Sequence, residues 1–174
     1  MRGKRQPTLP GFERMGLKKF GGTLLRGNAR EQRPISIKRP MHLVMRSSLA
    51  KGERSFLKKE AKIRGIIYAT AYNKGVRIYR YANAGNHLHL IVKPESRQAF
   101  KRFIRAVSGL IARAVLGVER GRAQGIRFWD AKPFTRILEW GRDYKNACEY
   151  LMTNLLEAIG FQPYRPRARA PARP

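Results

Sequence analysis

Hydrophobic and polar residues alternate over several short stretches of the chain, a pattern typical of β-strands. Residues 41–47 (MHLVMRS) follow a proline and predict a first strand, and residues 134–139 (FTRILE) predict a last one. Between them, residues 76–82 and 87–92 predict two more strands. The turn residues at 83–86 separate these two, so we expect a β-hairpin.

Apolar residues recur at three- and four-residue intervals in three other stretches, which predicts amphipathic helices at 53–72, 100–115 and 142–159. The order is therefore strand, helix, strand, strand, helix, strand, helix. It favours an α+β fold of the ferredoxin-like, split βαβ type, with an antiparallel four-stranded sheet and the helices on one face. We expect residues 41–160 to form one folded domain, which would carry the functional site.

The composition of the chain is strongly biased at both of its ends. Residues 1–40 are basic and broken by prolines and glycines, which predicts a largely flexible arm, and residues 161–174 form an Arg/Pro-rich tail that we expect to be disordered. The whole chain carries 38 Lys and Arg against 11 Asp and Glu, a net charge of +27. A field of this sign attracts polyanions, above all nucleic acid and less readily an anionic membrane.

Other features narrow the class of protein. No apolar run approaches the ~18 residues of a membrane helix, and the start of the chain lacks the apolar centre of a secretory signal, so we expect a cytoplasmic protein without a membrane partner. The single cysteine, Cys148, excludes an intramolecular disulfide. The chain has only two aspartates, Asp130 and Asp143, which leaves few carboxylates for a site with two metal ions.

The strand at 87–92 carries two of the three histidines. Successive side chains of a strand point to opposite faces, so His87 and His89 should share one face while Leu88 and Leu90 enter the core. Paired imidazoles on a strand make half a metal site. On the strand before it, we expect Arg77, Tyr79 and Tyr81 to share a face, which either stacks on bases or packs within the sheet.

The last predicted helix can supply a nucleophile. Its polar stripe includes Tyr150 and, one turn later, Asn154. Tyr150 could act as a phenolate nucleophile, with Asn154 or alternatively Glu149 as a further metal ligand. Tyr144 is a rival nucleophile, but the residue four positions after it is Cys148 rather than an amide.

These segments resemble a known family. GNHLHLIV resembles the histidine–hydrophobe–histidine (HUH) motif, and EYLMTNLLEA resembles the nucleophile helix of single-tyrosine HUH transposases, in particular those associated with repetitive extragenic palindromes. MHLVMRS and FWDAKPFTRIL resemble the first and fourth strands of that family, so the resemblance covers residues 39–160. The chain departs from the family with Ala84-Gly85 before the motif and Leu155 after Asn154, where proline is usual.

The resemblance implies a metal-dependent transposase that cleaves and rejoins single-stranded DNA, at hairpin or palindromic ends, through a 5′-phosphotyrosine. The family's metal ligands, for Mg²⁺ or Mn²⁺, correspond to His87, His89 and Asn154, and its nucleophile to Tyr150. Such enzymes act as monomers or homodimers. We expect further contacts with DNA from His42, Arg46, Arg77, Lys101, Arg105 and Arg136. Of these, His42 should be a structural residue or a phosphate contact rather than a metal ligand.

Two other functions fit the composition. One is a domesticated nucleic-acid-binding protein that keeps the fold without the reaction, although the presence of the two histidines, Tyr150 and Asn154 argues against it. The other is a basic ribosome-associated protein, which the charge and the two tails would suit.

Overall fold

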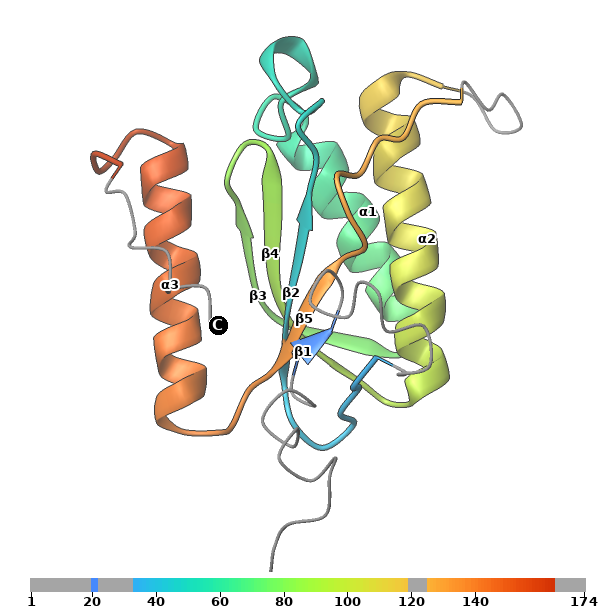
Figure 1. Cartoon of the computed structure of the whole chain (residues 1–174), viewed down its shortest axis with the longest axis vertical. Coiled ribbons are helices and arrows are strands. Elements are labelled where there is room, and N and C mark those ends of the chain that lie inside the picture. Colours follow the sequence, from blue (N-terminus) through green and yellow to red (C-terminus); the bar gives the residue numbers. More distant parts are fainter. Residues whose placement is uncertain (1–19, 22–32, 119–124, 165–174) are drawn as a thin grey trace, which may run out of the picture.

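An antiparallel sheet forms the centre of the molecule, with helices on both sides of it (Figure 1). The computed structural model describes residues 20–21, 33–118 and 125–164. Most of the predicted N-terminal arm and nearly all of the C-terminal tail therefore lie outside the described residues. The elements follow one another as β1 (Phe20–Gly21), β2 (Met41–Arg46), a 3₁₀ helix (Gly52–Arg54), α1 (Glu60–Asn73), β3 (Val76–Asn83), β4 (His87–Pro94), α2 (Arg97–Leu116), β5 (Phe134–Ile137) and α3 (Arg142–Ala158).

The strand order is β1-β5-β2-β4-β3, and every neighbouring pair is antiparallel. The four longer strands are those predicted from alternation, and their order is that of a ferredoxin-like split βαβ fold, which confirms the fold class. β1 adds a short fifth strand by pairing Phe20 and Gly21 with β5. Two residues carry too little pattern to be predicted, so this part of the basic arm was not expected in the sheet.

The helices do not share one face, which corrects part of the expected architecture. α1 and α2 cover the face from which Leu88, Leu90 and Val92 project, and together they enclose the larger hydrophobic core. α3 lies on the opposite face (Figure 1), where Ala147 and Leu151 pack against Ile91 of β4. Ile91 shares its face with the histidines, so the sheet has apolar residues on both sides and needs a helix on each.

The prediction that Tyr79 and Tyr81 share one face of β3 is also wrong. A β-bulge shifts the register between Ile78, which pairs with Val92, and Arg80, which pairs with Ile91. The extra residue reverses the alternation, so Tyr79 and Tyr81 point to opposite faces. Tyr79 contacts the α3 cluster, and Tyr81 packs on the α1 side, where its hydroxyl donates a 2.8 Å hydrogen bond to Glu60.

Two helix boundaries follow local chemistry. α2 begins after Ser96, whose hydroxyl accepts a 3.0 Å hydrogen bond from the Ala99 amide, and it ends at Gly117, which has φ of 71°. α1 starts at Glu60, later than the expected residue 53, because the chain first makes the 3₁₀ turn that buries Phe56. In the described part of the chain, no helix is both long and apolar enough to span a bilayer.

Candidate active site

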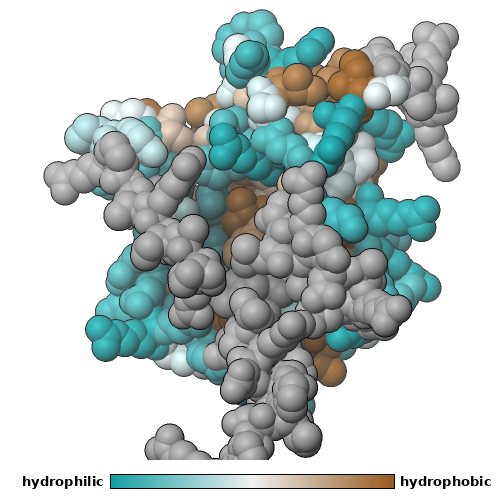
Figure 2. Space-filling model, viewed as in Figure 1, coloured by the Kyte–Doolittle hydropathy of each residue, from teal (hydrophilic) through white to brown (hydrophobic). Residues whose placement is uncertain are grey.

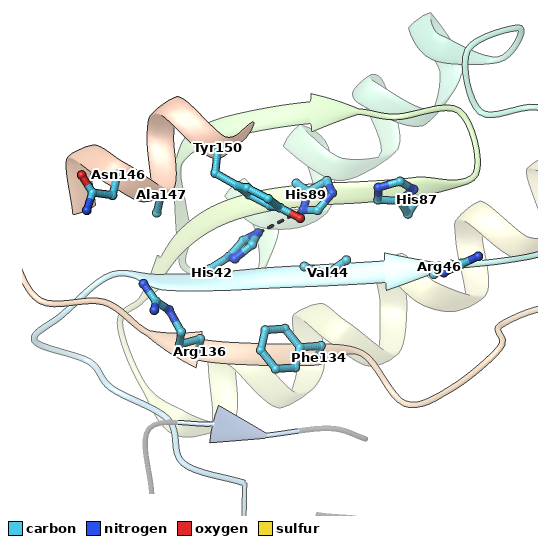
Figure 3. A pocket seen from close by; sticks show the side chains of 10 residues that line it. All are labelled: His42, Val44, Arg46, His87, His89, Phe134, Arg136, Asn146, Ala147 and Tyr150. Carbon is cyan, nitrogen blue, oxygen red and sulfur yellow. Dashed lines mark hydrogen bonds between the residues drawn. The ribbon is translucent and has the colours of Figure 1, made fainter. Parts of the chain in front are cut away.

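A cavity of about 540 Å³ opens between the sheet and α3 (Figure 3). Three strands and one helix contribute to its walls. The lining residues are His42, Val44 and Arg46 of β2, His87 and His89 of β4, Phe134 and Arg136 of β5, and Asn146, Ala147 and Tyr150 of α3.

Strand register brings the polar side chains together. β2 pairs with β4 so that Val44 lies opposite His89 and Arg46 opposite His87. β2 also pairs with β5, which places His42 opposite Arg136. Because side chains alternate along each strand, alternate residues of three neighbouring strands all face α3.

The three histidines lie in a row on this face. The Nε2 atom of His42 and the Nδ1 atom of His89 are 3.1 Å apart, in hydrogen-bonding range, and the two rings stack with their centroids 5.3 Å apart. Both residues are buried, at 8% and 2% exposure. Burial, with a smaller contribution from the Arg136 charge, lowers the pKa of His42 from 6.5 to about 4. His42 is therefore neutral near pH 7.

His87 completes the row, with its ring centroid 4.7 Å from that of His89. Its Nδ1 lies 2.6 Å from the Oδ1 of Asn86. An amide oxygen only accepts, so in this hydrogen bond Nδ1 of His87 is the donor. A hydrogen bond to one ring nitrogen orients the imidazole, as is usual for histidines that bind a metal through the other nitrogen.

Tyr150 projects from α3 over the histidines (Figure 3). Its ring centroid is 5.5 Å from that of His89 and 6.0 Å from that of His42, and the side chain remains 39% exposed. All of these residues belong to one chain. The tyrosine and the histidine pair, which are more than 60 positions apart in sequence, thus meet without a second subunit.

The other residues considered on α3 lie elsewhere. Asn154 is 5% exposed, and its Nδ2 donates a 2.6 Å hydrogen bond to the Tyr150 carbonyl; it does not line the cavity. Glu149 is exposed and is also absent from the lining. Tyr144 packs beside Tyr79, where burial and Cys148 raise its pKa, which disfavours the phenolate that a nucleophile needs.

Two arginines stand at the cavity, each beside one of the two aspartates. Arg46 forms an ion pair with Asp130 at 3.5 Å, and Asp130 also accepts hydrogen bonds from the amide and hydroxyl of Ser48. Arg136 pairs with Asp143 in the first turn of α3. No sequence pattern predicts these two ion pairs, because Asp130 lies in a loop and Asp143 at the start of a helix, where periodicity does not place side chains.

The expected DNA contacts divide into two groups. His42, Arg46 and Arg136 line the cavity, where guanidinium groups can meet a phosphate. Arg77 is exposed on β3, and it does not line the cavity. Lys101 and Arg105 are exposed on α2, on the other side of the sheet. Contacts from these three residues to DNA stay predictions.

The donors at the cavity fit a divalent metal only in part. Within the described ranges, no group of three or more His, Cys, Asp or Glu side chains is placed to hold a metal ion. His87 and His89 offer two neighbouring imidazoles, a donor set that suits Mn²⁺ better than Mg²⁺, which prefers oxygen ligands. The cavity has room for phosphate oxygens and water to complete such a coordination shell.

Comparison with known proteins bears on the fold. No protein-family profile matches the sequence, and no curated protein matches it significantly. Among solved structures, a REP-associated tyrosine transposase bound to a REP hairpin superposes with a TM-score of 0.61 and 13% sequence identity, over 78% of this chain and 81% of that one. The chain therefore has the fold of a REP-associated tyrosine transposase.

Proposed function

We propose that the protein is a transposase of the single-tyrosine HUH type, which cleaves and rejoins single-stranded DNA next to a hairpin. The observation that carries the proposal is the position of Tyr150 over His89 and His42 in one cavity of one chain. The fold likeness to a transposase bound to a hairpin supports it, as does the net charge of +27.

In the proposed reaction, the Tyr150 hydroxyl oxygen loses its proton and attacks a DNA phosphorus. The bond from phosphorus to the 3′ oxygen breaks, that oxygen takes up a proton, and a 5′-phosphotyrosine remains. The covalent link conserves the energy of the phosphodiester, so the reverse attack by a 3′-hydroxyl rejoins DNA without a nucleotide cofactor. Arg46 and Arg136 would orient the phosphate.

His87 and His89 are the residues that would hold a divalent metal, and the metal would polarise the scissile phosphate when bound. His42 contacts His89 directly and, being neutral, adds no charge that would repel the metal. Asn154 or Glu149 as a further ligand stays a prediction, since neither lines the cavity.

The test is covalent attachment. Full-length protein is incubated with Mn²⁺ and a hairpin oligonucleotide that has a single-stranded extension and a 3′ label. We expect a labelled protein–DNA adduct that Tyr150→Phe abolishes while leaving binding intact, and that the matched control Tyr144→Phe retains. An adduct from Tyr150→Phe at the wild-type level would show that the nucleophile is assigned wrongly.

DNA binding without cleavage is a second candidate, favoured by one observation. The Asn154 side chain bonds to the helix backbone and lies outside the cavity, so the described residues supply only two of the proposed metal ligands there. On this alternative, binding of hairpin DNA persists in EDTA and no adduct forms with any divalent metal.

A further inference from the structure

A second basic site lies along α2, on the sheet face opposite the tyrosine cavity. It is a groove of about 350 Å³, which we call the α2 groove. Four cationic side chains surround it: Arg33, Arg97, Lys101 and Arg105. Hydrophilic side chains project from the flank of the molecule that α2 forms (Figures 1 and 2), in keeping with a solvent-facing site.

Three of these cations repeat along one face of the helix. Arg97, Lys101 and Arg105 are four residues apart, so they lie one above another over about 12 Å of the helix axis. Like charges at this spacing destabilise a helix. Among the residues that the structure describes, no carboxylate forms an ion pair with any of the three. An external polyanion would relieve that repulsion.

The fourth cation is held in place by the protein. Arg33 donates hydrogen bonds from Nη1 to the Pro133 carbonyl at 2.6 Å and to the Thr135 hydroxyl at 3.0 Å. Arg97 in turn donates from its own Nη1 to the Arg33 carbonyl at 3.0 Å. These bonds connect α2 to β5 through the segment before β2, and they hold Arg33 in position beside the groove.

The groove and the tyrosine cavity use opposite faces of one strand. On β5, Phe134 and Arg136 line the cavity, whereas Thr135 between them bonds to Arg33 on the α2 side. Only the two residues of β1 extend the sheet beyond β5 in the described chain. A DNA molecule that passes around this edge could contact both sites.

The lining favours a duplex over a single strand. Binding of single strands generally relies on exposed aromatic rings that stack on bases. The only described aromatic residue of the groove is Phe100, which is 0% exposed and therefore unable to stack. The three cations instead span about 12 Å, which corresponds to roughly three to four nucleotides of one duplex strand, at 3.4 Å per nucleotide along the axis.

We propose that the α2 groove binds the sugar–phosphate backbone of duplex DNA. The inference rests on the proposed function: the groove would hold the stem of the hairpin while the adjoining single strand reaches Tyr150. Such contacts position the DNA and do not read its sequence.

The experiment compares two double variants of the full chain with equal net charge. Lys101→Gln/Arg105→Gln removes two groove cations, and Lys62→Gln/Arg102→Gln removes two exposed cations outside it. Binding of a labelled hairpin is measured by fluorescence anisotropy in EDTA over a range of salt concentrations. We expect the slope of log K against log salt to fall by about 1.8 in the groove variant, about 0.9 for each lost phosphate contact, and by much less in the control.

A linear oligonucleotide of the same length separates the possible outcomes. The groove variant should bind it as tightly as the control does. Equal slopes for the two variants on the hairpin would overturn the proposal, as would an equal loss on the linear strand. Because binding is measured without metal, absence of any adduct would refute the proposed reaction and leave the groove test intact.

Discussion

Because His42 is buried in its neutral form, the free energy of unfolding should depend on pH by an amount that can be calculated. Its pKa is about 4 in the folded protein and 6.5 when exposed, because burial and the Arg136 charge disfavour the protonated ring. The unfolded chain therefore binds more protons between these two values. Stability from this group is fully present above pH 6.5 and is lost as the pH falls towards 4.

The size of the effect follows from the shift. A difference of 2.5 pH units corresponds to about 3 kcal/mol, of which about 2 kcal/mol should be lost between pH 7 and pH 4.5. The groups that face His42 from the packed elements are His89, Arg136, Phe134 and Tyr150. Protonation of His42 would thus place a second, buried positive charge near Arg136.

The assay is chemical denaturation in EDTA at pH 7 and pH 4.5, for the wild type and for His42→Gln. Carboxylates titrate in both proteins, so the difference between their pH dependences isolates His42. The wild type should lose about 2 kcal/mol more than the variant over this interval. Identical losses in the two proteins would refute the account of a buried neutral histidine.

Two further substitutions test the packing around the site. Leu151→Ala should lower the free energy of unfolding by about 2–4 kcal/mol, because Leu151 is 2% exposed in the hydrophobic cluster that packs α3 against the sheet. Adduct formation should fall as well. A loss of stability below about 1 kcal/mol in urea denaturation would mean that this cluster does not hold the helix. Tyr81→Phe should cost about 1 kcal/mol, since it removes the hydrogen bond to Glu60. Burial and Glu60 also raise the pKa of Tyr81, so its absorbance should not change on titration to pH 11 in the folded protein.

Part of the site follows from local pattern alone. Alternation along residues 87–92 is enough to place His87 and His89 on one face and Leu88 and Leu90 on the other, because the side-chain period of a strand is two. The structure has this arrangement, with both leucines fully buried. Helical spacing likewise places Tyr150 and Asn154 on one side of α3.

Other features depend on what lies beside each segment. The β-bulge at Tyr79 changes the face of every residue on one side of it, and nothing in VRIYRYA marks its position. The side of the sheet that a helix covers depends on the path of the connecting loop, so α3 could not be assigned to the histidine face from its own apolar stripe. The position of the Asn154 side chain could not be predicted from helical spacing either, because its amide donates a hydrogen bond to the Tyr150 carbonyl of the same helix and does not point into the cavity.

The sequence by itself determined the four long strands, the three helices, the histidine pair and the strong positive charge, because each depends on residues that are close along the chain or on composition. Only the tertiary structure decided that His42 would join the pair, since this requires β2 to pair with β4 in one particular register. It also decided that Tyr150 would lie over His89, and that Arg33 would meet α2 beside β5. These contacts join residues distant in sequence, and only the packing of the sheet between its helices brings them within reach.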